Sequence, residues 1–406
     1  MPNIDFTLLD NTSRDITTVE GQPAGVVVPL PINAASLDGI PLIDEFDTLE
    51  SFTNALNGTY KDKILKIESD TYISTEEMIK LLLKNGFRVI TCALTAATAT
   101  DRATATTTVQ TAITTGKLFE DLKSRNNFDV QFLTTGVFGG TNDTAQSMTD
   151  VAAARGDAIA LIELPDNAPI SSVIGYNYEF THKEYAAAFY PQIKLATGFD
   201  TSSNTVVTKL APACLGYLLA YANSTTLNPD YFAVAGASRG VIPNLVDVVT
   251  RVTDADANVI NGANGETRSF VVNPIMNVYG HGIRIYGNRT CLQVESGKSK
   301  LFKNFLNVMI LVCDIIKRMQ SSAGACMFDP NDNVTWLKFI NLVYPLLEDM
   351  KANRGITYYK WVKEKVVEKG LIKATLHIRP IEAVEDFDLT VNLVDDDGVA
   401  ALEATV

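Results

Sequence analysis

The residues best suited by type and spacing to covalent chemistry form the pentapeptide Gly236-Ala237-Ser238-Arg239-Gly240, which fits the pattern G-x-S-x-G. The apolar run before it, Tyr231–Gly236, is interpreted as a β-strand. In α/β-hydrolases this pattern places a nucleophilic serine on a sharp turn between a strand and a helix. Ser238 would attack the substrate, and His281 or His377 would act as the base. A serine esterase is therefore one hypothesis for this chain.

Other features weaken the esterase hypothesis. Short patterns with common fixed residues arise by chance, and Pro243 would lie just inside the expected helix. No His-Gly-Gly-Gly segment that could form an oxyanion hole precedes the serine. We therefore expect a protein that is not an enzyme and has no catalytic residues.

Phosphate and metal chemistry have little support in the sequence. Gly297-Lys298-Ser299 matches the end of a P-loop, but Leu292 stands where the first glycine is required. The five cysteines have no C-x-x-C spacing and are predicted to be buried, reduced thiols. The histidines His182, His281 and His377 are far apart, so we expect no metal site and no cofactor. His281, between two glycines, is predicted to be packed or hydrogen-bonded.

Composition and charge restrict the possible partners. The 406 residues suffice for two or three domains. The net charge of −13 argues against nucleic-acid binding, which needs basic patches. The N-terminus has no secretory signal pattern. The most apolar segment, Leu301–Met319, is interrupted by Lys303, Asp314 and Lys317, which favours a buried amphipathic helix over membrane insertion.

Strand and helix patterns alternate along much of the chain, which predicts an α/β layer with a largely parallel sheet. Buried strands are expected at Val26–Val28, Phe87–Cys92, Val130–Leu133 and Ala158–Pro165. Helices are expected after Asp47, at Ser74–Leu83, at Asp143–Arg155 and over residues 209–222. Ser74 and Glu77 should form a capping box. Asp157 is predicted to be a structural cap or salt-bridge partner.

Residues 93–116 are rich in threonine and alanine and lack a clear period, which predicts a surface loop or variable insertion. Beyond them, Lys298–Gln320 is expected to form one long helix, and Asn333 to cap a further helix that ends at Met350. The first of these helices is basic in an acidic protein, which indicates a solvated face or a contact with an acidic partner. Its basic residues are Lys298, Lys300, Lys303, Lys317 and Arg318.

Both ends of the chain carry alternating apolar residues. They are Ile4, Phe6 and Leu8 near the N-terminus, and Ala374, Leu376, Ile378, Phe387, Leu389, Val391 and Leu393 near the C-terminus. A two-stranded ribbon made of Ala374–Ile378 and Phe387–Val394 would expose unpaired edge groups. A strand from a neighbouring copy could complete it by β-augmentation, and such a contact propagates as a filament. Pairing within one chain is the alternative, and the pattern leaves both open.

A glycine-rich segment gives the most specific signal. Asn273-Pro274 is followed by Gly280-His281-Gly282 and then by Ile283–Thr290, which ends in Gly287-Asn288-Arg289-Thr290. Alternation at Ile283–Tyr286 predicts a short strand between two places where backbones approach closely. The segment is built to position backbone and contains no obvious nucleophile. It resembles the NP…G-x-G-I-x-I-[WY]-GNRT signature of contractile tail sheath proteins of myophage type.

Further motifs extend this resemblance over most of the chain. Pro23–Val28 resembles the family's PGVYV-type strand, and Ala154–Ile162 resembles its a-x-R-x-D motif, although Glu163 replaces the usual aspartate. Tyr231–Gly240 resembles W-x-A-P-A-G-x-x-R-G, in which Ser238 falls at a variable position. Phe328–Trp336 resembles F-E-P-N-x-x-x-l-W, and a closing G-x-l…P-a-E motif is matched between Gly370 and Glu385.

The resemblance implies a mechanical function. Sheath subunits stack as hexameric rings around an inner tail tube and shorten to drive the tube through a target envelope for genome ejection. The implied partners are other copies of the chain, the tail tube protein, and baseplate and tail terminator proteins. The implied location is the virion tail, after assembly in the host cytoplasm. Lys298, Lys300 and Lys303 are the predicted tube-facing residues, and the terminal arms are predicted to interlock by β-augmentation.

The resemblance also implies a mixed, multi-domain α/β fold. Its middle domain has a largely parallel, subtilisin-like sheet without an active site, and an α+β inner domain and extended terminal arms follow. The expected divisions are a linking arm at 1–22, an α/β region with the Thr/Ala-rich insertion at 23–117, the subtilisin-like domain at 118–290, the inner domain at 291–385, and a C-terminal strand and arm at 386–406.

Overall fold

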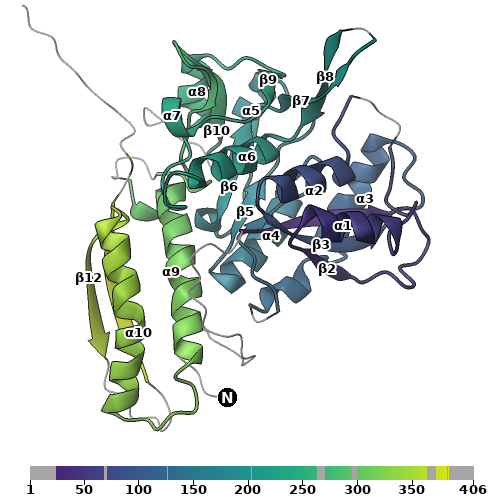
Figure 1. Ribbon diagram of the computed structural model, residues 1–406. Coiled ribbons are helices and arrows are strands. Elements are labelled where there is room, and N and C mark those ends of the chain that lie inside the picture. Colours follow the sequence, from purple (N-terminus) through teal and green to yellow (C-terminus); the bar gives the residue numbers. More distant parts are fainter. Residues whose placement is uncertain are drawn as a thin grey trace, which may run out of the picture.

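A computed structural model of the chain describes residues 24–67, 71–125, 127–202, 204–262, 270–294, 300–363, 372–381 and 383. Its centre is an eight-stranded sheet in the order β11-β10-β6-β5-β4-β1-β3-β2 (Figure 1). Six strands run parallel, and antiparallel β2 and β11 close the two sides. The bounds are β1 (Gly25–Ile32), β2 (Ile43–Phe46), β3 (Arg88–Thr95), β4 (Phe132–Leu133), β5 (Ile159–Ile162), β6 (Ala186–Tyr190), β10 (Asn273–Val278) and β11 (Gly282–Ile285). This confirms the predicted α/β class with a large, mostly parallel sheet.

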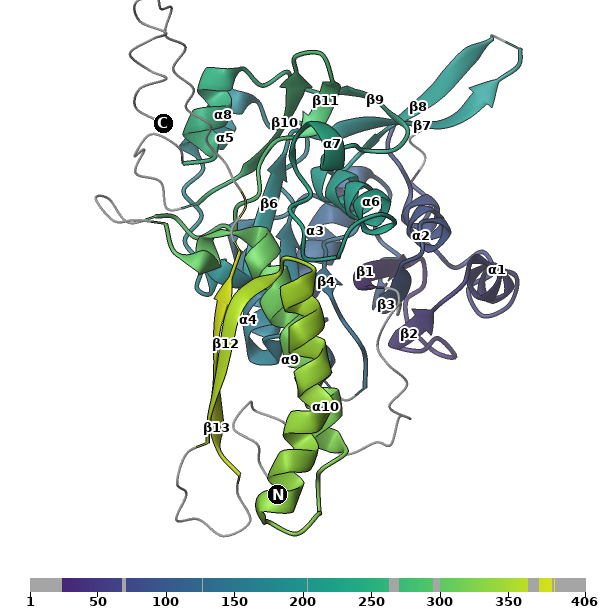
Figure 2. The same cartoon turned by 60° about the vertical axis from the view of Figure 1, so that its left-hand side comes forward.

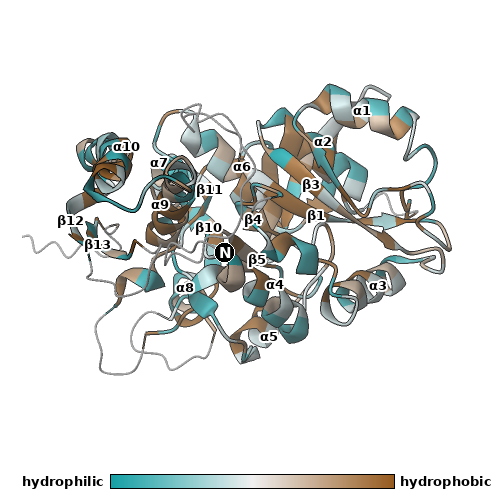
Figure 3. Cartoon of the chain, turned by 90° about the horizontal axis from the view of Figure 1, so that it is seen from below, coloured by the Kyte–Doolittle hydropathy of each residue, from teal (hydrophilic) through white to brown (hydrophobic). Residues whose placement is uncertain are grey.

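Helices cover both faces of this sheet. Seen from below, α2 and α6 lie on one side of the apolar strands, and α3, α4 and α5 lie on the other (Figure 3). The bounds are α1 (Leu49–Asn57), α2 (Thr75–Lys84), α3 (Arg102–Thr114), α4 (Asn142–Arg155), α5 (Ile170–Gly175), α6 (Ala213–Thr225), α7 (Gly236–Arg239) and α8 (Asp254–Ile260), with short 3₁₀ turns at Glu120–Lys123 and Lys183–Tyr185. Strands buried on both faces account for their nearly continuous apolar sequences.

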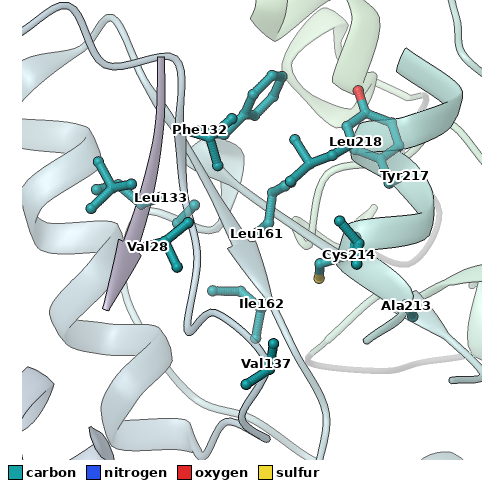
Figure 4. Packing of buried hydrophobic residues seen from close by; sticks show 14 of the residues in the cluster. Val28, Phe132, Leu133, Val137, Leu161, Ile162, Ala213, Cys214, Tyr217 and Leu218 are labelled. Atoms are coloured by element: carbon teal, nitrogen blue, oxygen red, sulfur yellow. The ribbon is translucent and has the colours of Figure 1, made fainter. Parts of the chain in front are cut away.

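Alternate side chains of the central strands fill two apolar layers. Phe132 and Leu161 point toward α6, where Tyr217 meets the Phe132 ring edge-on at 6.1 Å between ring centroids (Figure 4). Leu133 and Ile162 point to the opposite side. All five side chains are buried. Burial of this kind supplies most of the free energy that holds such a sheet between its helices.

A second, antiparallel sheet carries a hairpin that projects from the body (Figures 1 and 2). It consists of β7 (Ile193–Asp200), β8 (Thr205–Ala211) and β9 (Leu245–Val248), in the order β8-β7-β9. Lys209 of β8 forms a 2.7 Å ion pair with Glu77 of α2, which ties the hairpin's base to the body. Glu77 is also the N3 residue of the predicted capping box with Ser74, which the structure confirms.

The C-terminal part forms a unit that extends away from the large sheet (Figures 1 and 2). It begins with a 3₁₀ turn, Phe302–Asn304, and continues with α9 (Leu306–Gly324), α10 (Asn333–Ala352) and an antiparallel ribbon of β12 (Ile356–Lys363) and β13 (Ala374–Pro380). This unit has its own apolar core. Leu306, Met309 and Ile310 of α9 join the main core, whereas Leu311, Ile315 and Met319 join the smaller one. Helix α9 is therefore shared by both bodies.

Two secondary-structure predictions were wrong. Residues 93–116 are not a loop, because β3 runs to Thr95 and α3 occupies Arg102–Thr114. Asp101 caps that helix, and Ala105, Val109 and Ile113 form its buried stripe. Threonine hydroxyls obscure the pattern, because they donate to carbonyl oxygens one turn earlier instead of marking a turn. In addition, Tyr231–Gly236 forms no strand.

Helix starts also differ from the predictions. The long helix begins at Leu306, not at Lys298, because Asn304 accepts the Leu301 N–H and holds the preceding residues in a 3₁₀ turn. Asp332, not Asn333, caps α10, since its carboxylate accepts the N–H groups of Val334 and Thr335. The domain divisions stay predictions, although the strands on either side of residue 117 pair in one sheet.

Candidate functional site

Asn273 is the centre of the signature segment. It is fully buried on β10, and its amide group donates to the carbonyl oxygens of Ala188 at 3.1 Å and Arg289 at 2.7 Å. Its Oδ1 accepts the Arg289 N–H at 2.7 Å. One side chain therefore joins β6, β10 and the segment after β11. Buried amides that satisfy this many backbone groups fix the local path of the chain.

Gly287 allows this arrangement because no side chain would fit there. A Cβ atom at this position would lie 2.6 Å from the Asn273 Oδ1 and 3.0 Å from its Cα. Such distances are shorter than van der Waals contact, and the obstacle includes backbone. The glycine is required for close approach, as the sequence predicted, and not for a positive φ angle.

Asn288 supplies the cap that α9 lacks locally. Phe305, at the N-cap position, makes no side-chain cap. The Asn288 Oδ1 accepts the N–H of Asn307, 19 residues later in the chain, at 3.2 Å, and its Nδ2 donates to the Asn307 Oδ1 at 2.7 Å. The Asn288 carbonyl also accepts the Leu306 N–H at 3.0 Å. The signature therefore positions the start of the helix that links the two bodies.

Arg289 and Thr290 complete this junction. Arg289 is buried, with its guanidinium 5.7 Å from the ring centroid of Phe305. Thr290 donates its hydroxyl to the Lys303 carbonyl at 2.9 Å, and its N–H bonds the Asn304 carbonyl at 3.0 Å. We call Asn273, Gly287, Asn288, Arg289 and Thr290 the signature junction. The polar groups of the signature junction form hydrogen bonds that join β6, β10, the segment after β11 and the start of α9.

The esterase motif lacks the geometry of a catalytic triad. Ser238 is exposed on the four-residue helix α7 and makes no hydrogen bond to His281 or His377. His281 was predicted to be packed or hydrogen-bonded. It lies exposed in the turn between β10 and β11, so its side chain is not packed, and its backbone N–H donates to the Val278 carbonyl. Gly240 packs tightly under Ile285, whose carbonyl oxygen would lie 2.4 Å from an added Cβ. Gly240 thus serves close packing, whereas Gly236 has open space around it and adopts a positive φ of 81°.

Neither a metal site nor reactive thiols appear in the described parts of the chain. No group of three or more acidic, histidine or cysteine side chains there could hold a metal ion. All five cysteines are free, and four of them are buried. Burial raises the pKa of the Cys92, Cys291 and Cys313 thiols well above the ordinary value. These thiols therefore stay protonated and unreactive at neutral pH.

Asp157 is a salt-bridge partner, as predicted. Its carboxylate forms a two-pronged pair with the guanidinium of Arg155, at 2.9 and 3.1 Å. Arg155 is fully buried, and it also donates to the carbonyl oxygens of Leu122, Ser124 and Phe128. Each nitrogen of this buried guanidinium donates hydrogen bonds, and these bonds hold the end of α4 against the loop before β4.

Glu163, where the family motif has aspartate, caps α6. Its two carboxylate oxygens accept the N–H groups of Ala213 and Cys214, the first residues of that helix, at 3.1 and 3.0 Å. Burial raises the pKa of this carboxyl to about 7, although the two N–H donors pull it downward. A small cavity beside it is lined by residues including Pro165, Tyr190 and Gln192 and has room for about one water molecule.

The C-terminal ribbon contains a strand that the sequence analysis missed. Ala374–Ile378 lies in a strand as predicted, and its antiparallel partner is β12, Ile356–Lys363. The predicted partner, Phe387–Val394, lies outside the described residues. In the described chain β12 and β13 pair only with each other, so the ribbon has two open edges. Its inner face, which includes Tyr359, Trp361, Leu376 and Ile378, packs on the small core without being fully buried.

The remaining predicted site residues have mixed outcomes. The arm residues Ile4, Phe6, Leu8, Phe387, Leu389, Val391 and Leu393, and also Lys298, lie outside the described residues. Lys300 and Lys303 are exposed just before α9. Lys317 and Arg318 are not a basic surface, because they pair with Asp129 at 2.7 Å and Asp314 at 2.8 Å. For Lys317 and Arg318 the predicted solvated face was therefore wrong, because both pair with carboxylates of the same chain.

Comparisons with known proteins give matches in structure only. No family model and no curated protein sequence matches the chain. The sheath complex of an extracellular contractile injection system, PVC, in its contracted state matches with a TM-score of 0.63 over 97% of this chain and 99% of that chain, at 14% identity. A structure of the anti-feeding prophage baseplate matches with a TM-score of 0.61 over 97% and 99%, at 13% identity. A sheath tail protein from Desulfitobacterium hafniense matches with a TM-score of 0.53 over 92% and 100%, at 9% identity.

This chain has the fold of contractile sheath proteins. The matches run from end to end, so they include the large sheet and the C-terminal unit together. They confirm the resemblance that the signature segment indicated. In the described residues, no helix has both the length and the apolar character needed to cross a membrane.

Proposed function

We propose that the chain is the structural subunit of a contractile sheath. Copies stack as hexameric rings around an inner tube, and the sheath shortens to drive the tube through a target envelope. In a phage tail this stroke leads to genome ejection. The sheath fold over nearly the whole chain supports the proposal, and the observation that carries it is the C-terminal ribbon, whose two edges have no partner strand among the described residues.

An isolated two-stranded ribbon is marginally stable and invites further strands. Here the ribbon is supported on one face by α10, where Trp361 meets Trp336 and Phe339 edge-on at 6.1 and 5.6 Å. Trp336 and Trp361 remain half-buried, so apolar surface is left beside the ribbon. Strands added at both edges would cover this surface and satisfy the edge backbone groups.

The chain's own termini have the pattern of such strands. Ile4, Phe6 and Leu8 alternate with polar residues, and so do Phe387, Leu389, Val391 and Leu393. Arms that pair with neighbouring copies form heterologous contacts, which extend as a helical polymer instead of closing into a dimer. Connections of this kind keep subunits attached while their other interfaces rearrange.

The other proposed partners are the tube, baseplate and tail terminator proteins, with the particle assembled in the host cytoplasm. For the tube contact we retain Lys298, Lys300 and Lys303 as candidates. Lys300 and Lys303 are exposed cations in a chain of net charge −13, which suits an acidic partner surface.

The test is electron microscopy of the purified full chain in negative stain. We expect hollow sleeves of stacked rings. A variant without residues 1–20 should remain folded, with unchanged thermal unfolding, and should run as a monomer in gel filtration. In the matched control, a Gly/Ser sequence of equal length replaces the same twenty residues. It keeps the chain length but lacks the alternating apolar side chains, so it should also remain a monomer. Sleeves of normal length from the deletion variant would refute the arm model, and a wild-type monomer at high concentration would refute the sheath function.

A further inference from the structure

The loop that follows α6 packs along one face of α9. The Tyr231 carbonyl oxygen accepts a hydrogen bond from the Asn307 Nδ2 at 3.4 Å, and the Tyr231 ring belongs to the small core, which Leu311 also joins. Asn307, Leu311 and Asp314 follow one another at helical spacing, so they form a single stripe on α9. Asp230 directly precedes Tyr231, and its carboxylate lies close enough to that of Asp314 for their charges to interact. We call Asp230 and Asp314 the carboxyl pair.

Asp314 has one satisfied carboxylate oxygen and one that is not. Its Oδ1 accepts a hydrogen bond from the Arg318 Nε at 2.8 Å. Its Oδ2 is buried and accepts no hydrogen bond from any described residue. A buried polar atom without a partner costs free energy, and nearly all such atoms in folded proteins are paired. A donor is therefore expected beside the Asp314 Oδ2.

The neighbouring cations do not supply that donor. Lys317 forms its ion pair with Asp129 at 2.7 Å and also donates to the Gln131 Oε1 at 2.8 Å. Arg318 uses its Nε on the other oxygen of Asp314. The further titratable groups that face the carboxyl pair are Asp349 of α10, Tyr221 of α6, Cys313 of α9 and Tyr231 of the loop itself. All of these are acids, so one guanidinium serves two carboxylates.

The carboxyl pair holds a proton more tightly than an exposed carboxylate does. Burial raises the pKa of Asp230 from 3.8 to about 6, and the charge of Asp314 acts in the same direction, against the opposing effect of Arg318. Burial also raises the pKa of Asp314. One proton between two such groups removes their repulsion and belongs to the pair. It also creates a hydroxyl donor where the Asp314 Oδ2 has none.

We propose that Asp230 and Asp314 share one proton at mildly acidic pH, with the Asp230 hydroxyl donating to the Asp314 Oδ2, and that this hydrogen bond holds the loop after α6 on α9. Release of the proton leaves two facing carboxylates, so the loop should separate from the helix more readily at neutral pH. The loop starts at α6 in the main body and ends in the small core through Tyr231, so the bond reinforces the joint between the two bodies. The inference goes beyond the sheath function and does not depend on it, because the contact lies within one subunit.

The sign of the pH effect follows from the two pKa values of Asp230. The folded state binds the proton more tightly than the open state, so the stabilisation is complete below pH 3.8 and is lost as the pH rises through about 6. Between pH 5 and pH 7 the equilibrium constant for opening should therefore rise about tenfold.

The test is hydrogen exchange of the full chain, measured by mass spectrometry and corrected for the intrinsic effect of pH. Protection of residues 228–234 should fall about tenfold from pH 5 to pH 7 relative to α4. Asp230→Asn should abolish the fall and keep protection high, because its amide donates at every pH. Asp230→Ala should give low protection at both pH values. Asp62→Asn, which changes an exposed carboxylate in the turn after α1, is the matched control and should behave as the wild type.

Infrared spectra can identify the proton directly. Because Glu163 titrates in the same pH range, the spectra are compared between Glu163→Gln and the double variant Glu163→Gln with Asp230→Asn. The single variant should show an additional band of a protonated carboxyl group at pH 5, and this band should largely disappear by pH 7.

Three results would overturn the proposal. They are protection of residues 228–234 that does not change with pH in the wild type, a change that persists in Asp230→Asn, and recovery of protection at pH 7 on addition of Ca²⁺, which would replace the shared proton by a metal ion. None of them bears on sleeve formation, so the carboxyl pair and the sheath function fail separately.

Discussion

Arg155 in the main body and Arg379 in the ribbon show two opposite ways to place a guanidinium. Arg155 is fully buried and bonds a carboxylate and three carbonyl groups within its own subunit. Among the described residues, Arg379 is exposed on a strand whose other edge has no partner, and its side chain makes no hydrogen bond or ion pair. The main body is thus held by contacts among its own residues, whereas we propose that strands from other copies complete the ribbon. Substitutions in the body should change the stability of the monomer, and substitutions on the ribbon should change assembly.

The largest expected effect is that of Arg155→Met, which tests whether contacts within the main body determine its stability. It leaves Asp157 buried without its partner and removes bonds to the carbonyl groups of three residues. We expect the free energy of unfolding to fall by about 3–5 kcal/mol, measured by urea denaturation. Lys123→Met, which breaks the exposed pair with Glu120, is the control and should cost about 0–1 kcal/mol. Equal effects of the two variants would show that the buried network does not hold the body together.

The buried carboxyl of Glu163 should make the stability of the main body depend on pH. Its pKa is raised from about 4.5 in the unfolded chain to about 7 in the folded one, so the folded state binds the proton more tightly. Stability from this group is therefore present below pH 4.5, declines as the pH rises, and is lost above pH 7. The decline should be about 3 kcal/mol. Glu163→Gln cannot ionise and should flatten the wild-type slope between pH 5 and 7 in denaturation midpoints, whereas Glu120→Gln should leave it unchanged. A variant that keeps the full slope would assign the titration to another group.

The signature junction lies between the two regions, and Asn288→Ala tests it. The substitution removes the distant cap of α9 and leaves the buried Asn307 Oδ1 without its donor, which should cost about 1–2 kcal/mol. Hydrogen exchange should accelerate in the first turn of α9 more than in α4. Asn341→Ala, on the exposed face of α10, is the control and should change stability by less than about 0.5 kcal/mol. Uniform acceleration of exchange throughout the chain would mean that the junction is not a local coupling point.

The smallest expected effect concerns Ser238. An exposed serine without a histidine partner should not react with a fluorophosphonate probe, and Ser238→Ala should behave as the wild type in labelling and in assembly. A trypsin-like protease of known reactivity serves as the positive control. Stoichiometric labelling at Ser238 that is lost in Ser238→Ala would instead revive the esterase hypothesis.

Sequence reasoning worked where local chemistry decides the structure. The capping box of Ser74 and Glu77, the helix Asn142–Arg155 and the buried strand at Ile159–Ile162 follow from signals within a few residues. It failed where distant groups decide. Helix α9 begins at Leu306 because Asn288 and Asn304 hold its start, and no pattern inside the helix shows this.

The candidate site was predictable in part. The signature segment was found as a place of close backbone approach, and its glycine has that role. Strand β12 was missed, although Ile356–Val362 is rich in β-branched and aromatic residues and could have been recognised. The cross-strand pairs of the ribbon needed the structure, because residues such as Lys360 and His377 become neighbours only through the strand register.

The remote cap on α9 has a mechanical consequence. Asn288, which follows the edge strand of the large sheet, forms two side-chain hydrogen bonds with Asn307 in the first turn of α9. A sliding or rotation of α9 against that sheet would break these bonds. The same helix also contributes side chains to both apolar cores. In the contractile sheath proposed above, torque applied at the ribbon would therefore turn each subunit as a rigid body, and the shortening would take place at the contacts between subunits.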